Sequence, residues 1–256
     1  MSTVIPPLPS EVAATPALSE PQRIINTFIA PSKTFADIRR SASWWVPWLL
    51  LTLVGLGASA VIVKKVDFYE MTRQQIANSR QAAQFESLPK DQQEQRLAIG
   101  VKIGKIFTFV LPVIGPILGA LLIGALMMGT FNFVFEAEVR FRQALAIIFY
   151  AWLPGLLHGI FTMATLLLRS DTENVNIRNL VATNPGYFMD PNTSSKFVYG
   201  MASSLDIFSI WIIILIGIGF AVNASNRKRL STGTAIVTVA AWFFLYRLII
   251  SAIGWV

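Results

Sequence analysis

Cysteine is absent from this sequence of 256 residues, and His158 is its single histidine. Disulfide bonds, thiolate catalysis and cysteine-based zinc sites are therefore excluded, as are zinc sites that need two histidines. The sequence also lacks an HExxH metal motif, a Gly-x-Ser-x-Gly nucleophile motif and a glycine-rich phosphate loop. We therefore expect a protein that is not an enzyme, with no catalytic residue, no metal site and no bound cofactor.

Charge is scarce as well. Charged residues make up 14% of the chain and hydrophobic residues 54%, whereas soluble domains average about 25% charged residues. This deficit is typical of a chain that is surrounded largely by lipid. The net charge of +7 suits anionic lipid headgroups. No basic stripe with interleaved aromatic residues is present, so the expected partner is the lipid bilayer and not a nucleic acid.

Five long apolar stretches, separated by polar loops, decide the fold class. Each is close to the ~20 apolar residues that a helix needs to cross a hydrocarbon core about 30 Å thick. A helix in the core of a soluble protein rarely stays apolar on every face over such a length. The sequence therefore predicts an all-α, polytopic integral membrane protein with five transmembrane helices. The predicted spans are Trp44–Val63, Ile106–Met128, Leu145–Leu168, Ile207–Val222 and Thr234–Ile253.

The segment Met1–Pro21 contains five prolines and no apolar h-region. Because proline removes backbone donors and the segment cannot form a core, we expect a disordered tail. No cleavable signal peptide is evident, which leaves the first span as the expected targeting signal. Residues 22–256 are expected to form one five-span membrane domain.

A polar segment before the first span, Gln22–Ser43, has a different pattern. Thr34 and Asp37 resemble a capping box, in which an N-cap hydroxyl and an acidic side chain satisfy the first amides of a helix. The following apolar residues fall on one helical face: Phe35, Ile38, Ala42 and Trp45. This pattern predicts an interfacial helix on the membrane surface. The alternative is a simple basic flank that fixes the orientation of the chain.

The longest polar loop, Lys64–Lys105, predicts two further surface helices. Its glutamine-rich stretches, Met71–Phe85 and Lys90–Lys105, have helical composition, and Leu88 and Pro89 between them mark a break. We expect the second of these helices to continue into the second span.

Small residues indicate how the spans pack, because lipid provides no hydrophobic drive between helices. Gly115 with Gly119, and Gly155 with Gly159, match the GxxxG pattern. We expect packing within the chain, and homodimerisation is the alternative. Pro154 lies inside the third span and predicts a kink, because neighbouring groups or water must satisfy the backbone atoms that it frees. Two more prolines, Pro112 and Pro116, lie inside the second span.

Three polar residues within or at the ends of spans are the candidate functional residues. Arg247 is costly in a span unless it snorkels, pairs or faces a wet cavity. Asp206, at the start of the fourth span, and the C-terminal carboxylate are its candidate partners. His158, in the third span, has two interpretations: a proton relay, or a histidine bonded to a neighbouring helix.

Three stretches occur in an order that resembles a known family. The sequence APSKTFADI at Ala30–Ile38 lies just before the first span, and a glutamine-rich helical loop follows that span. The sequence VRFRQALA at Val139–Ala146 then leads into YAWLP at Tyr150–Pro154. This order is similar to the bacterial branch of the Yip family, the Ypt/Rab-interacting protein domain. The resemblance covers Gln22–Val256.

The resemblance implies a five-helix domain in the bacterial inner membrane, with a cytoplasmic N-terminus and an outward C-terminus. With this orientation, nine basic residues lie inside and eleven outside, so the charge count alone leaves the orientation open. Eukaryotic relatives are non-enzymatic factors in vesicle traffic that bind Rab-type GTPases and form hetero-oligomers. Their Asp-Leu-Tyr-Gly-Pro motif is absent here, so we expect no Rab-type GTPase partner. A homo- or hetero-oligomer is compatible with the resemblance.

Two functions follow from these observations. The first is a membrane adaptor or organiser, suggested by the resemblance, the predicted interfacial helix and the lack of catalytic motifs. The alternative is a small transporter, channel or lipid-translocating protein, suggested by the prolines and polar residues within the spans.

Overall fold

The computed structural model describes residues 17–79, 81–169, 179–190, 193–225 and 230–253. These residues are largely helical, and none of them is in a β-strand. The helices are α1 (Glu20–Ile29), α2 (Pro31–Ile38), α3 (Trp45–Lys65), α4 (Phe68–Ala77), α5 (Ala82–Glu86), α6 (Lys90–Phe135), α7 (Phe141–Ala151), α8 (Pro154–Leu168), the 3-10 helix η2 (Pro185–Phe188), α9 (Lys196–Ser204), α10 (Ile207–Asn223) and α11 (Thr232–Ala252). Most of the predicted tail lies outside the described residues, and α1 begins two residues before the expected boundary.

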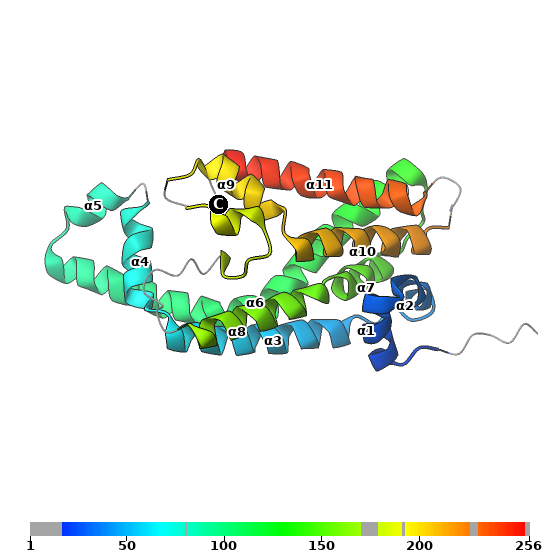
Figure 1. Cartoon of the computed structure of the whole chain (residues 1–256), viewed down its shortest axis with the longest axis horizontal. Coiled ribbons are helices and arrows are strands. Elements are labelled where there is room, and N and C mark those ends of the chain that lie inside the picture. Colours follow the sequence, from blue (N-terminus) through cyan, green and yellow to red (C-terminus); the bar gives the residue numbers. More distant parts are fainter. Residues whose placement is uncertain (1–16, 80, 170–178, 191–192, 226–229, 254–256) are drawn as a thin grey trace, which may run out of the picture.

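The long helices form an elongated bundle (Figure 1). The helices α3, α6 and α11, and the broken helix of α7 and α8, are each long and apolar enough to cross a membrane. The helices α9 and α10 pass the same test together but are bent by 57°, so they provide a fifth span if the pair is counted as one. This confirms the all-α, polytopic membrane fold. The third predicted span contains a break between α7 and α8. The fourth predicted span, Ile207–Val222, corresponds to α10 alone, and the bent pair adds α9 before it.

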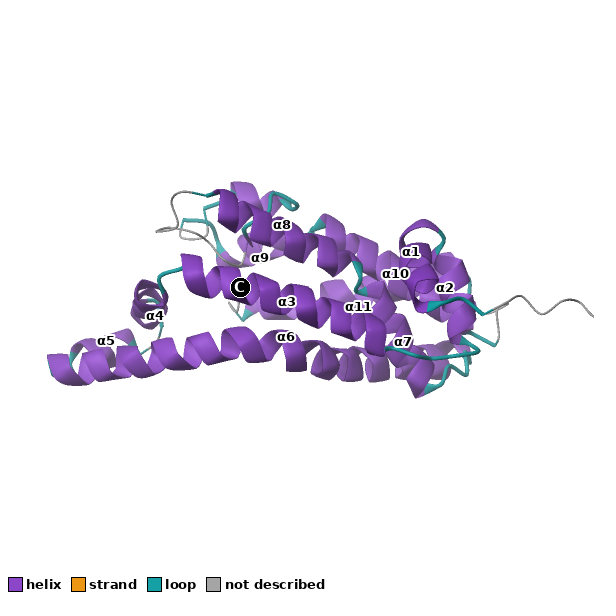
Figure 2. Cartoon of the chain, turned by 90° about the horizontal axis from the view of Figure 1, so that it is seen from below, coloured by secondary structure: helices purple, strands orange, loops and turns teal. Residues whose placement is uncertain are grey.

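The longest helix, α6, has 46 residues. At a rise of ~1.5 Å per residue it is about 69 Å long, roughly twice what a membrane core about 30 Å thick requires. Its first part is the predicted surface helix, which does continue into the second span. The other predicted surface helix is two shorter ones, α4 and α5. Figure 2 shows both at one end of the bundle, with α1 and α2 at the other end.

The prolines of α6 are satisfied by α3. Pro112 has no N–H, so the carbonyl of Thr108 lacks its helical donor, and the Ser59 hydroxyl donates to it at 2.6 Å. Pro116 frees the carbonyl of Pro112 in the same way, and the Thr52 hydroxyl donates to that oxygen at 3.3 Å. Buried polar partners on a neighbouring helix are what allow prolines inside a span.

The predicted glycine pairs have different environments. A Cβ added to Gly159 would lie 2.8 Å from Val54 Cγ1, and one added to Gly155 would lie 3.8 Å from Leu51 Cδ2, so this pair packs α8 against α3. A Cβ added to Gly119 would lie 3.1 Å from Trp152 Cη2, but one added to Gly115 meets nothing within 4 Å. The two glycines of α6 therefore do not form a close helix contact together within the chain.

Pro154 ends the straight course of the third span. It is buried and is the first residue of α8. The preceding helix, α7, ends at Ala151, and a turn at Trp152 and Leu153 separates the two helices. The predicted kink is thus a break between α7 and α8.

The helix α7 is the centre of the core. Every residue from Ala144 to Ala151 is buried, and α7 packs against α6 and α10. On α10, a Cβ added to Gly217 would lie 2.7 Å from the Ile236 Cα, so α10 and α11 approach at backbone distance. The well-packed core therefore lies at the end of the bundle that carries α1 and α2.

Candidate functional site

The helices α1 and α2 form a hairpin that caps one end of the bundle, with α1 lying across the bundle axis (Figure 1). The start of α1 is fixed by a capping box: the Gln22 N–H donates to the Ser19 hydroxyl at 3.4 Å, and the Ser19 N–H donates to the Gln22 side chain at 2.9 Å. Pro21 in the first turn and Pro31 at the start of α2 favour these starting points.

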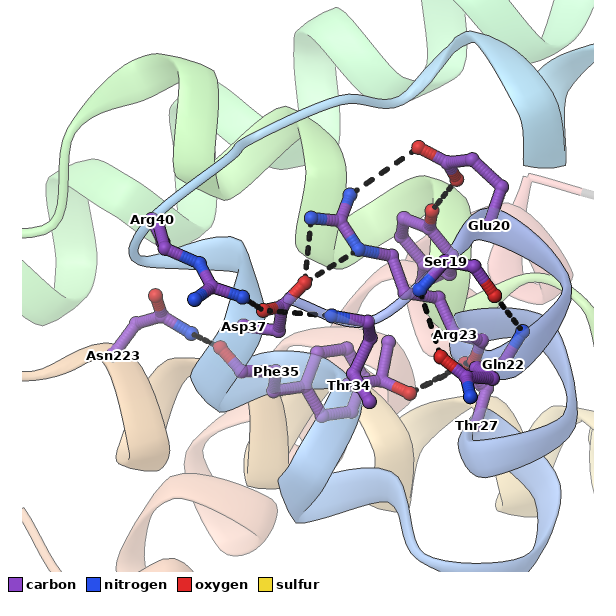
Figure 3. A network of polar contacts seen from close by, with 12 residues as sticks. Ser19, Glu20, Gln22, Arg23, Thr27, Thr34, Phe35, Asp37, Arg40 and Asn223 are labelled. Carbon is purple, nitrogen blue, oxygen red and sulfur yellow. Dashed lines mark hydrogen bonds and ion pairs between the residues drawn. The ribbon is translucent and has the colours of Figure 1, made fainter. Parts of the chain in front are cut away.

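A buried ion pair joins the two helices of the hairpin. The Arg23 guanidinium, with 4% of its side chain exposed, donates to Asp37 Oδ2 from Nε at 2.7 Å and lies 2.6 Å from it through Nη2. The other Asp37 oxygen accepts from Arg40 Nη2 at 2.5 Å and from the Leu18 N–H at 3.5 Å. Figure 3 shows Asp37 between the two arginines. Both oxygens of the Asp37 carboxylate therefore have partners in the hairpin or in the residues just before it.

The surroundings of Asp37 lower the pKa of its carboxyl group below the ordinary value of 3.8. Burial alone would raise this pKa, but the hydrogen bonds and positive charge of Arg23, with a hydrogen bond from Arg40, outweigh burial. Removing one partner of a buried ion pair leaves an uncompensated charge and costs roughly 3–5 kcal/mol. Loss of either partner is therefore expected to weaken the contact between α1 and α2.

Further hydrogen bonds fix the backbone of the hairpin. The Thr27 and Thr34 hydroxyls both donate to the Arg23 carbonyl at 2.8 Å, one from α1 and one from α2. Both threonines are fully buried. They make a polar seam beside the ion pair.

Three more contacts attach the hairpin to the bundle. The Tyr150 hydroxyl of α7 donates to Glu20 Oε2 at 2.5 Å, and the Asn223 amide of α10 donates to the Phe35 carbonyl at 2.9 Å. Arg39 donates to the Ala224 carbonyl at 3.0 Å, where a cation also complements the C-terminal end of the helix dipole. The hairpin is therefore a fixed part of the domain.

The predicted interfacial helix was wrong in two respects. The Thr34 hydroxyl donates to Arg23 and Asp37 pairs with arginines, so they do not form a capping box. Phe35 and Ile38 are fully buried against the bundle, and α2 ends at Ile38. The reason is that α7 and α10 provide a protein surface where the sequence pattern suggested lipid.

The outer face of α1 is apolar. Ile25 is 57% exposed and Ile29 is 75% exposed, and these two residues lie one turn apart on the same face. The neighbouring Lys33 is exposed as well. The hairpin thus presents two apolar side chains and a cation away from the core.

The three predicted polar residues of the spans meet at the break between α9 and α10. Asp206 is the N-cap of α10: it accepts from the Phe208 and Ser209 N–H groups at 2.9 and 3.2 Å, and also from the Thr183 hydroxyl. Arg247 of α11 donates to the Ser204 hydroxyl at 2.5 Å. The His158 ring packs edge-on against Phe208, with 5.4 Å between centroids.

Arg247 does not pair with Asp206, which was one of its two candidate partners. Arg247 also donates to the Gly200 carbonyl at 3.1 Å, so its hydrogen-bond partners in the described part of the chain are neutral. The C-terminal residue, the other candidate partner, lies outside the described residues.

The break lies near the mid-length of the bundle, and the residues on either side of Asp206, Leu205 and Ile207, are 47% and 59% exposed. His158 contacts Phe208, and the neighbouring Gly159 contacts Val54, which is near the middle of α3. Irregular backbone at such a depth is tolerated where it is buried in protein or lines a wet cavity. The region is thus the second candidate site of the chain.

The sequence prediction missed the hairpin network, above all Glu20, Arg23 and Tyr150. One signal was readable: Ser19 and Gln22 have the spacing of a capping box and place a helix start at Glu20. The contact between Glu20 and Tyr150 spans 130 positions, and no local pattern indicates it.

Comparison with known proteins gives one match. A family model described as the Yip1 domain matches residues 25–253, which is nearly the whole chain. Searches of curated proteins and of solved structures give no match. Among the described residues, no group of three or more histidine, aspartate or glutamate side chains is arranged to hold a metal ion.

Proposed function

The chain belongs to the Yip1 domain family, and from this premise we propose that this multi-pass membrane protein is a non-enzymatic adaptor or organiser. Its α1–α2 hairpin is the platform that contacts a partner. The observation that carries this proposal is the combination of a hairpin fixed by the Arg23–Asp37 pair with exposed Ile25 and Ile29 on its outer face.

A fixed platform favours binding. A segment that is already ordered loses little conformational entropy when it binds, so more of the contact energy appears as affinity. Exposed isoleucines are suitable anchors, because burying apolar side chains is the main favourable term in protein association. Lys33, exposed in the first turn of α2, would favour a partner with acidic residues.

The test is cross-linking in intact membranes followed by identification of the cross-linked proteins. We expect the double variant Ile25→Asp/Ile29→Asp to lose a specific partner that the wild type captures. The control is Tyr69→Asp on α4, which changes a side chain of 47% exposure at the far end of the bundle. Partner capture that is equal in all three proteins would refute the proposal.

A second function has its own observation. A small transporter, channel or lipid-translocating protein is supported by the break between α9 and α10, where the half-buried Asp206, Arg247 and His158 gather near the mid-length of the bundle. Discontinuous helices with polar residues at such a depth form the binding sites of many transporters. Flux of ions, solutes or fluorescent lipids through liposomes containing the purified protein, lowered by Arg247→Ala, would favour this function over the adaptor.

We further propose that the protein belongs to the bacterial branch of the family and lies in the inner membrane with its N-terminus in the cytoplasm. The chain has no cysteine, so single cysteines can be labelled without background. A membrane-impermeant maleimide applied to intact cells should label Ser79→Cys, beyond α4, but not Ser32→Cys on the hairpin. The reverse pattern would establish the opposite orientation.

A further inference from the structure

Basic side chains gather at one level of the bundle, at the end opposite the hairpin. They come from three helices that are distant in sequence: the end of α3, the first half of α6 and the residue after α8. We call this group the cation ring; it consists of Lys64, Lys65, Lys102, Lys105 and Arg169.

The contacts between α3 and α6 place four members of the ring at nearly the same height along the bundle. The two helices run antiparallel, because Ser59 bonds to Thr108 while Thr52 bonds to Pro112. The two α3 lysines follow Ser59 by less than two turns, and the two α6 lysines precede Thr108 by the same distance or less. All four therefore lie at nearly the same height.

The contacts between α3 and α8 add Arg169. These two helices run parallel, since Gly155 lies against Leu51, and Gly159 lies against Val54. Met163 of α8 lies beside Gly57, with its sulfur 3.3 Å from the position of an added Cβ. Arg169 follows Met163 by six residues, and Lys64 follows Gly57 by seven. Arg169 therefore lies at nearly the same height as Lys64.

The ring lies at the edge of an exposed apolar surface. Immediately on the span side of Lys105, Ile106 and Phe107 are 52% and 53% exposed. Leu168, which precedes Arg169, is 86% exposed. Cations bordering a band of exposed apolar side chains are in the position where phospholipid headgroups meet their hydrocarbon chains.

The ring has no internal counterion in the part of the chain that the structure describes. The four ion pairs formed by described residues involve none of its members, and three of its lysines are exposed: Lys64, Lys102 and Lys105. Among the described residues, the two acids at the start of the adjacent α4 have partners of their own, because Asp67 caps α4 and Glu70 pairs with Arg73 at 3.8 Å. The helix α4 crosses α6 at this point, and Lys105 Nζ lies 5.7 Å from the centre of the Phe68 ring.

We propose that the cation ring binds the headgroups of anionic phospholipids. Five cations at one height, with no carboxylate partner among the residues that the structure describes, attract phosphate, and the adjoining apolar side chains accommodate the acyl chains. Each lysine near an anionic membrane surface strengthens binding by roughly fivefold. The site is separate from the hairpin and does not depend on the adaptor function.

The test uses the full-length protein in nanodiscs and measures the enrichment of phosphatidylglycerol over phosphatidylcholine around the protein by native mass spectrometry. We expect K64Q/K65Q/K102Q/K105Q to lower this enrichment by at least tenfold. A matched variant removes four exposed cations elsewhere, K33Q/K90Q/R96Q/R142Q, and should retain most of the enrichment. The charge-preserving variant K64R/K65R/K102R/K105R shows whether the fold survives substitution, and we expect it to retain the enrichment.

Three outcomes would overturn the proposal. The first is equal loss in the ring variant and the matched variant, which would indicate a diffuse charge effect. The second is unchanged enrichment in the ring variant. The third is displacement of phosphatidylglycerol by millimolar inorganic phosphate, which would assign the ring to a soluble anion.

Discussion

The two ends of the bundle both carry basic residues, yet these residues do different things. At the hairpin end Arg23 is buried and paired with Asp37, and Arg39 caps α10. At the far end the cation ring is largely exposed and, among the described residues, forms no ion pair. A count of basic residues does not distinguish these two groups. The first group stabilises the fold, and the second is the group that we propose binds an external anion.

The strongest way to break the hairpin end is Asp37→Ala. This change leaves the buried Arg23 guanidinium with only the Glu20 carboxylate, 3.4 Å away, and removes one partner of Arg40. We expect a loss of about 3–5 kcal/mol from the attachment of the hairpin. Hydrogen exchange measured on peptides covering residues 20–38 should then accelerate about a hundredfold or more, while peptides from α3 keep their protection. Unchanged exchange would mean that apolar packing alone holds the hairpin.

A smaller effect is expected from overpacking the contact between α10 and the hairpin. A Cβ added to Gly219 would lie 2.4 Å from Ile147 Cγ2 and 3.2 Å from the Phe35 ring. Gly219→Ala should therefore destabilise the domain by about 1–3 kcal/mol. The control is Gly115→Ala, which meets nothing within 4 Å and gains helix propensity, so it should be neutral or stabilising. Thermal unfolding followed by circular dichroism compares the two.

Acid should loosen the hairpin, and the sign follows from Asp37. Its pKa is lower in the folded protein than the ordinary 3.8, so the unfolded chain takes up the proton first as the pH falls. The stabilisation is therefore fully present above about pH 4 and is lost as the pH falls through the lowered pKa. Digestion with pepsin between pH 5 and pH 2 should release the hairpin progressively. Asp37→Asn should remove this pH dependence, and a wild-type hairpin that stays intact throughout would contradict the assignment.

The fold was largely predictable because its cause is local. A helix in lipid needs about 20 apolar residues, and that requirement is visible as a run in the sequence. The breaks have local signals as well: Pro154 begins α8, and Asp206 precedes an apolar run in the position of an N-cap. The extension of α6 beyond the span was predicted for the same reason.

The sites were much less predictable because they depend on contacts between distant segments. His158, Arg247 and Asp206 were chosen one by one for their cost in a span, and only the course of the helices brings them to one break. Arg23 has a partner within its own helix, Glu20 at 3.4 Å, but its main partner, Asp37, lies in α2 and comes close only when the hairpin closes. The cation ring depends on the register of α3 with α6, which Ser59 and Pro112 determine.

The smallest expected effect sharpens the comparison between the two ends. The far end does contain an ion pair, Glu70 with Arg73, but it is 3.8 Å long and its side chains are 45% and 66% exposed. Water already solvates both charges, so Glu70→Gln should change the free energy of unfolding by no more than about 0.5 kcal/mol. The same measurement on Asp37→Ala should give a change several times larger, although both substitutions remove one acidic partner of an arginine. If the two variants proved equally stable, burial would not be what distinguishes the hairpin end from the far end, and the contrast between paired and free cations would lose its physical basis.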